Sequence, residues 1–113
     1  MEEIKVRLWY PKQKIMSVPL SIWNLPDYDK LEEKPVVLMN TQLKDKNGKE
    51  IFEGDIVKGQ AYKDGEIQVK EVEFDEGQFY ADIELSNRDF YEAIERGWVE
   101  VIGNKFENPD LLK

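Results

Sequence analysis

Hydrophobic residues occupy every second position at the start of the chain, from Ile4 to Leu8. A period of two is typical of a strand with one buried face, so residues 3–9 are predicted to form a strand whose other row, with Arg7 and Trp9, faces outward.

A corner follows this strand. Pro11 lacks a backbone donor and precedes three polar residues, after which apolar residues return at 15–18. This pattern predicts a hairpin.

Prolines interrupt the next stretch. Pro19, Pro26 and Pro35 fall within or at the end of residues 17–35. Because proline fixes φ and removes a donor, this segment is predicted to be an irregular excursion without a continuous helix or central strand, anchored by Trp23.

The strongest local signal is Asn47-Gly48, which follows a compact apolar strand at 36–40. Asn-Gly between extended segments favours a hairpin with a type I′ turn, in which both central residues have positive φ. Gly54, just before Asp55, interrupts the following strand pattern and predicts a bulge or sharp bend of the kind that closes small barrels.

The alternation then changes phase. Apolar residues stand at odd positions up to Val69 and at even positions from Val72, which predicts a bulge or twist across Lys70-Glu71. A further alternating run predicts a strand at 79–85.

Helical spacing appears only once. Phe90 and Ile94 are four residues apart, Ser86 can cap the start, and Gly97 can cap the end. We therefore expect one short α-helix at about 87–96.

The pattern closes with a strand at 98–102 and a final turn in which Pro109 takes the first helical position. Short strands joined by Gly and Asn turns indicate a mainly β fold, a small barrel or sandwich. With 113 residues and 13.3 kDa, the chain is expected to form a single domain.

Charge narrows the function classes. Sixteen basic and 24 acidic residues give a net charge of −8, which argues against sequence-independent binding of nucleic acid. The charged N-terminal residues do not resemble a signal peptide, and the longest apolar run is strand-sized, so we expect a cytoplasmic protein without a membrane span.

The chain contains neither Cys nor His. Disulfides, thiolate or imidazole metal sites and His-dependent nucleophiles are therefore excluded. The glycines are isolated and form neither a P-loop nor a dinucleotide fingerprint, so we expect no cofactor.

Carboxylates are the remaining catalytic candidates. Asp45 to Glu50 resembles part of a calcium loop, but Gly48 and Lys49 stand where the motif does not allow them. Asp82 and Glu84 share one face of a predicted strand and would suit a carboxylate-based hydrolase only if they were buried together; a solvated polar face is the simpler interpretation.

Tryptophans offer candidate interfaces. Trp9, Trp23 and Trp98 could anchor a partner or stack bases, although packing in the core is the ordinary role of such residues. The negative charge ordinarily serves solubility, and alternatively could compete for a basic nucleic-acid groove on another protein.

The segment LKDKNGKEIFEGDIV at 43–57 resembles the central signature of the YopX family, small proteins of phages and prophages. Residues 3–16 are similar to the family's opening and 101–112 to its ending. Gln42 stands where the family usually has Gly, and Tyr10 where Asp usually follows Trp. Without the glycine, a tight backbone before the hairpin is less expected, and without the aspartate, a carboxylate that could form a turn after Trp9 is missing.

The resemblance implies a small SH3-like barrel with additional strands, a phage or prophage origin and action in the bacterial cytoplasm. It implies no activity and transfers no catalytic residue. The signature residues Asn47, Gly48, Gly54 and Asp55 are therefore interpreted as architectural.

Two hypotheses follow. The first is a non-enzymatic protein-binding or self-assembling module that binds a host protein or forms a homo-oligomer, because small barrels leave strand edges that self-pairing can cover. The alternative is an acidic decoy that inhibits a host nucleic-acid-binding protein.

Overall fold

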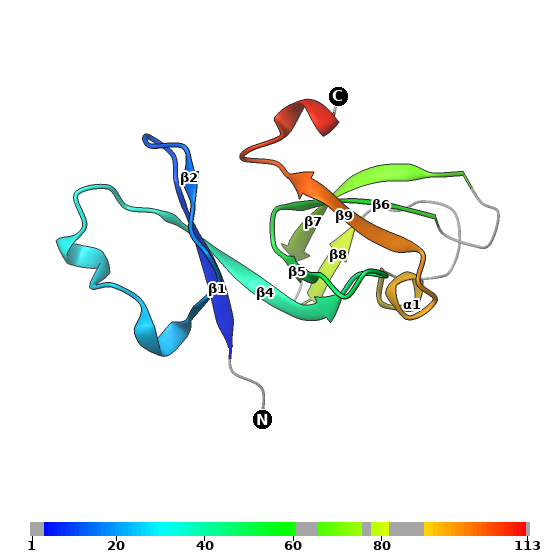
Figure 1. Ribbon diagram of the computed structural model, residues 1–113, viewed down its shortest axis with the longest axis horizontal. Helices are drawn as coiled ribbons and strands as arrows, with labels where there is room; N and C mark the ends of the chain where they lie inside the picture. Colours follow the sequence, from blue (N-terminus) through cyan, green and yellow to red (C-terminus); the bar gives the residue numbers. More distant parts are fainter. Residues whose placement is uncertain (1–3, 61–65, 76–77, 82–89, 113) are drawn as a thin grey trace.

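The structure, a computed structural model, describes residues 4–60, 66–75, 78–81 and 90–112. These residues form two antiparallel sheets (Figure 1). The first has the order β2-β1-β4-β5, with β3 also paired to β1, and the second has the order β8-β7-β6-β9.

The strands of the first sheet are β1 (Lys5–Tyr10), β2 (Ile15–Met16), β3 (Leu20–Ser21), β4 (Val36–Lys44) and β5 (Glu50–Phe52). The second sheet contains β6 (Asp55–Gly59), β7 (Gln68–Asp75), β8 (Gln78–Ala81) and β9 (Val99–Asn104). The helical elements are η1 (Ile22–Asn24), η2 (Tyr28–Lys30), α1 (Phe90–Glu95) and η3 (Pro109–Leu112).

The molecule is elongated, with extents of 49 × 36 × 27 Å and a radius of gyration of 14.9 Å. A compact domain of this length would have a radius of about 13 Å. β4 extends from the N-terminal sheet toward the curled second sheet (Figure 1). A pocket lined by residues of both sheets lies between them.

The predicted N-terminal hairpin is confirmed, because β1 pairs with β2 through Trp9 and Met16. The expectation that Trp9 faces outward is wrong, since only 7% of its surface is exposed. The reason is that β1 is covered on that face as well: the ring of Phe106 lies 5.5 Å from the Trp9 ring.

Residues 17–35 contain only β3, η1 and η2 as regular elements. Trp23 does not anchor this segment, because 83% of its surface is exposed. The anchoring contacts are polar instead: the N–H of Ile22 donates to the carbonyl of Ile4, and the Glu33 carboxylate accepts the N–H of Lys12.

The predicted hairpin around Asn47-Gly48 is present, with Lys44 opposite Glu50, but the type I′ turn is wrong. Gly48 has φ +81°, whereas Asn47 has no positive φ. Gly48 N–H donates to the Asp45 carbonyl and Asp45 N–H to the Lys49 carbonyl, so the loop is a tight turn closed by a left-handed glycine.

The bend predicted at Gly54 is present between β5 and β6. Gly54 has φ +87°, and its N–H donates to the carbonyl of Val72 in β7. A Cβ at this position would lie 2.9 Å from the Phe106 ring. The close approach explains why glycine is needed here.

The bulge predicted at Lys70-Glu71 is not found. β7 pairs without a register shift, first with β6 through residues 68–71 and then with β8 through 72–75. The sequence pattern shifts because Val69 lies on the exposed side and Val72 is fully buried.

The predicted short helix is present as α1, and the expected start at 87–89 and the strand positions at 82–85 lie outside the described residues. Gly97, with φ +75°, ends the helix: its N–H donates to Ile94 and that of Trp98 to Ala93. This is the Schellman arrangement.

The largest group of packed buried residues lies inside the curled sheet and under the helix, and consists of Ile51, Val57, Val72, Ala81, Ala93 and Val99. The expectation of a mainly β fold with a small barrel-like sheet and one short helix is confirmed. Within the described residues, no helix is long and apolar enough to cross a membrane.

Candidate functional site

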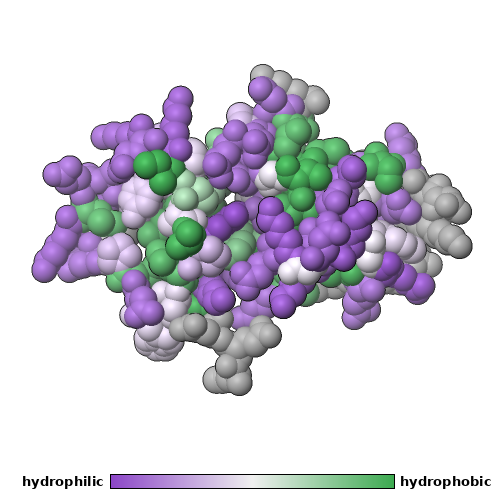
Figure 2. Space-filling view, in the orientation of Figure 1, coloured by the Kyte–Doolittle hydropathy of each residue, from purple (hydrophilic) through white to green (hydrophobic). Residues whose placement is uncertain are grey.

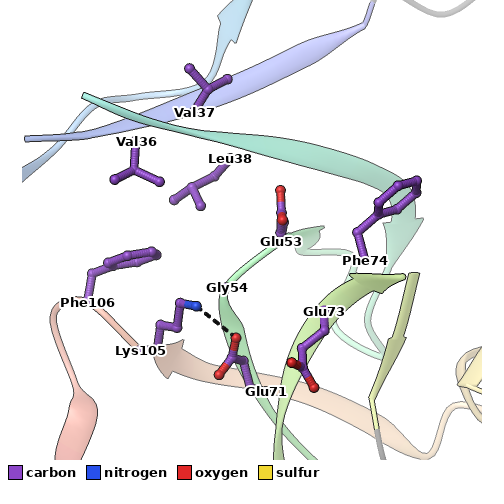
Figure 3. Close-up of a pocket in the computed structure, with 10 residues that line it drawn as sticks. All are labelled: Val36, Val37, Leu38, Glu53, Gly54, Glu71, Glu73, Phe74, Lys105 and Phe106. Carbon is purple, nitrogen blue, oxygen red and sulfur yellow. Dashed lines mark ion pairs between the residues drawn. The ribbon is translucent and has the colours of Figure 1, made fainter. Parts of the chain in front are cut away.

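A groove lies where the two sheets meet, between β4 and β7 (Figure 3). It encloses about 200 Å³, and ten residues line it: Val36, Val37, Leu38, Glu53, Gly54, Glu71, Glu73, Phe74, Lys105 and Phe106. We call this feature the seam groove. Its volume is below the ~300–1,000 Å³ of most small-molecule sites, so it suits a narrow ligand better.

One wall of the seam groove is apolar. Val36 and Leu38 point toward Phe106 (Figure 3). Leu38 is buried, whereas Val36 is 40% exposed and Phe74, farther along the groove, 46%. Exposed apolar side chains beside a groove are the usual composition of a surface that binds another molecule.

The other wall carries charge. The Glu71 carboxylate forms an ion pair with the Lys105 ammonium at 3.0 Å, and the Glu53 carboxylate accepts a hydrogen bond from the Met39 N–H at 3.4 Å. Glu73 has no ion-pair partner among the described residues. Three carboxylates and one ammonium leave the wall with two excess negative charges.

These carboxylates do not form a cation site, since no group of three or more acidic side chains within the described ranges could hold a metal ion. Asp82 and Glu84, the sequence candidates for a hydrolytic pair, lie outside those ranges.

A buried ion pair involves Asp55, the residue that follows Gly54 of the groove lining. The guanidinium of Arg7 donates to the carboxylate of Asp55, and the Arg7 side chain stacks 4.4 Å from the centre of the Phe52 ring. Asp55 also accepts the N–H of Phe52 at 2.8 Å. Burial raises the pKa of Asp55, which Arg7 and the Phe52 N–H partly oppose. Asp55 therefore joins β1 to β6, consistent with an architectural role.

Asn47 and Gly48 lie on the barrel, in the hairpin that packs against β9. The side-chain amide of Asn47 donates a hydrogen bond to the Glu100 carboxylate at 3.1 Å.

Asp45 is the key residue of this hairpin, although sequence reasoning treated it only as part of a weak calcium motif. The buried Asp45 carboxylate accepts the N–H groups of Asn47, Lys49 and Val101, each at 2.9 Å. Its position two residues before Asn-Gly, suited to an Asx turn, was the available signal.

The three tryptophans do not come together as a site. Trp9 is buried against Phe106, Trp98 is half-buried against the barrel core, and Trp23 is exposed. Trp9 contributes to the seam groove only by supporting Phe106. The interface role of Trp23 stays a prediction.

Sequence reasoning missed the seam groove itself. Its charged residues come from the β5–β6 turn, from β7 and from the segment after β9, which no local pattern brings together. The one available signal for the groove was the shift in the hydrophobic alternation along β7, which places the apolar residue Phe74 at an exposed position.

The visible face of the molecule is mostly hydrophilic, with hydrophobic side chains gathered in separate clusters over the two sheets (Figure 2). Hydrophilic side chains thus separate the apolar clusters on this face.

The family profile described as "YopX protein" matches residues 6–113. Among solved structures, the chain is similar to the crystal structure of protein EF1440 from Enterococcus faecalis, with 25% identity, a TM-score of 0.68, and coverage of 97% of this chain and 98% of that one. No curated protein matches the chain.

Proposed function

The chain belongs to the YopX protein family, and from that premise we propose that it is a non-enzymatic protein-binding module whose binding surface is the seam groove. The proposal includes the phage or prophage origin and the cytoplasmic location that the family resemblance implies.

One observation carries the proposal: exposed apolar side chains and unbalanced carboxylates line the same seam groove. Val36 and Phe74 are each at least 40% exposed, and Glu73 lacks a described counter-ion. A protein segment with apolar and basic side chains satisfies both walls, since apolar burial contributes affinity and charge complementarity contributes specificity.

The narrowness of the groove also favours a protein segment. At about 200 Å³ it can bury a few side chains, not a cofactor-sized molecule. Its rigid frame, held by the buried pair of Arg7 and Asp55, reduces the entropy lost on binding.

A random-peptide library selected on the purified protein tests the proposal. We expect enriched peptides that bind the wild type and bind Phe74→Asp at least about tenfold more weakly, because that change places a charge on the apolar wall. The matched control is Ile67→Asp, a similarly exposed apolar residue that does not line the groove.

Enriched peptides that bind wild type and Phe74→Asp equally would overturn the assignment of the groove. Self-assembly, the other form of the hypothesis, is checked separately by sedimentation velocity. A wild-type dimer that Phe74→Asp dissociates would make a second copy the occupant.

A further inference from the structure

We infer that the seam groove receives its ligand as an added β-strand: an extended peptide with a basic side chain pairs with the open edge of β4 at Val37. This inference rests on the proposed function and adds to it the binding mode and the chemistry of the ligand.

The open edge arises because β4 changes its partner. Residues 36–39 pair with β1, and pairing with β5 on the opposite side begins only at Asn40, which lies opposite Phe52. Among the described residues, no strand lies along the β5 side of the first four residues of β4, and this is the side of Glu53 and the seam groove (Figure 3).

The backbone of Val37 points to that side. Its register partner in β1 is Leu8, whose own N–H and carbonyl bond to Ser17 on the far side of β1. Val37 and Leu8 are therefore a non-hydrogen-bonded pair, in which the N–H and carbonyl of Val37 point away from β1.

Met39 supports the same direction. Two residues along the strand from Val37, it bonds across to Glu53 through both its carbonyl, at 2.8 Å, and its N–H, at 3.4 Å. Alternate residues of a strand direct their polar groups to the same edge. Beyond the ladder with β1, no hydrogen bond to Val37 is found among the described residues.

Glu53 shows how a ligand would continue the edge. Its N–H donates to the Met39 carbonyl as a strand residue would, while its side-chain carboxylate accepts the Met39 N–H, and the chain turns away at Gly54. An added strand would extend this pairing past Glu53 to Val37. Toward the other end, Pro35 has no N–H to offer, so the paired stretch is short.

The charge of the opposite wall selects the ligand. Glu53 and Glu73 flank the groove, and Glu71 is already paired with Lys105. On the face of the added strand that points into the groove, a lysine or arginine would meet Glu73, which has no described partner, and apolar side chains two positions away would contact Val36 and Phe74. An acidic strand would be repelled.

The probe is the blocked five-residue peptide Val-Thr-Lys-Thr-Val, whose valines and lysine share one face of an extended strand, titrated into ¹⁵N-labelled protein. We expect the Val37 amide resonance to shift and its hydrogen exchange to slow. A twin peptide with N-methylated backbone amides should bind at least about tenfold more weakly, because its backbone cannot donate hydrogen bonds to the strand edge. A glutamate twin should not bind.

The role of Glu73 is tested with Glu73→Gln, which should weaken the lysine peptide several-fold at low salt. The control Glu95→Gln removes another exposed carboxylate, from α1 and outside the groove, and should leave binding unchanged. Equal losses in the two variants would overturn the charge selection.

Equal binding of the N-methylated twin would overturn strand addition and leave the proposed protein-binding function intact. Failure of the valine–lysine peptide to bind at millimolar concentration would also overturn the inference. The proposed function would then be judged by the library selection alone, since that experiment assumes neither a strand nor a basic ligand.

Discussion

Arg7 and Asp55, 48 residues apart in the sequence, form a buried ion pair that joins the N-terminal sheet to the curled sheet. The Arg7 side chain is 14% exposed and that of Asp55 only 2%. Because Arg7 lies in β1 and Asp55 follows the Gly54 bend, this contact ties the two sheets together next to a residue that lines the seam groove.

Asp55→Asn should lower the free energy of unfolding by about 3–5 kcal/mol, because it leaves the Arg7 guanidinium buried without its counter-charge. Urea unfolding of the variant measures this loss. Adding Arg7→Met to Asp55→Asn should recover part of it, since the uncompensated charge is then absent. A loss below about 1 kcal/mol in the single variant would contradict a structural role for the pair.

Gly54→Ala and Gly48→Ala separate backbone strain from steric contact. Both glycines have positive φ, which costs an L-residue about 1–2 kcal/mol. At Gly48 no described atom lies within 4 Å of a new Cβ, whereas at Gly54 the Phe106 ring would lie at 2.9 Å. Thermal unfolding should therefore show that Gly54→Ala loses about 1–3 kcal/mol more than Gly48→Ala.

Trimming the ring supplies the control for this comparison. Phe106→Leu should reduce the additional cost of Gly54→Ala, because the clash is with the ring edge. If the two glycine variants lose the same stability, close packing of Phe106 on the bend is not what requires glycine.

Local patterns predicted much of the fold because each required only neighbouring residues. The alternation from Ile4 to Leu8 predicted β1, Asn47-Gly48 predicted the hairpin, and Gly97 marked the end of α1. These features depend on strand period, turn chemistry and capping, which are readable within a few positions.

The features that sequence reasoning missed depend on long-range contacts. Trp9 is buried only because Phe106, from the other end of the chain, covers it. The prediction of a type I′ turn was wrong because the Asp45 carboxylate accepts two N–H groups of its own turn and one of β9. These contacts favour a loop with a single left-handed residue. The seam groove combines residues from β4, β7 and the segment after β9, so no local pattern could predict it.

Gln42→Gly should stabilise the protein by about 1 kcal/mol. Gln42 has φ +66° in the irregular stretch of β4 between Asn40 and Lys44, so it bears the strain of a left-handed residue that glycine avoids. The tight backbone is thus kept here despite the glutamine, and the glycine that the resemblance implies at this position would adopt it without strain. The greater flexibility of glycine in the unfolded chain offsets part of the gain.

Chemical denaturation measures the change, and Gln42→Ala is the matched control. Alanine keeps the Cβ that causes the strain, so it should not stabilise the protein. Equal effects of the two substitutions would show that the conformation at this position is not under strain.

Asn47→Ala should raise the pKa of Glu100 toward its ordinary value of 4.5. The Asn47 side-chain amide is the main cause of the lowered pKa of Glu100, followed by the charge of Lys46, with Lys58 adding less. A group with a lowered pKa in the folded state stabilises the fold above its unfolded pKa and loses that contribution as the pH falls through the folded value. The stability difference between wild type and Asn47→Ala should therefore shrink below about pH 4.5.

An NMR titration of the Glu100 side-chain carboxyl carbon checks the pKa directly, with Asn24→Ala, at an exposed site in η1, as the control. Asn47 has no positive φ, so alanine fits the turn without strain, and an unchanged Glu100 titration would mean that this amide does not hold the hairpin to β9.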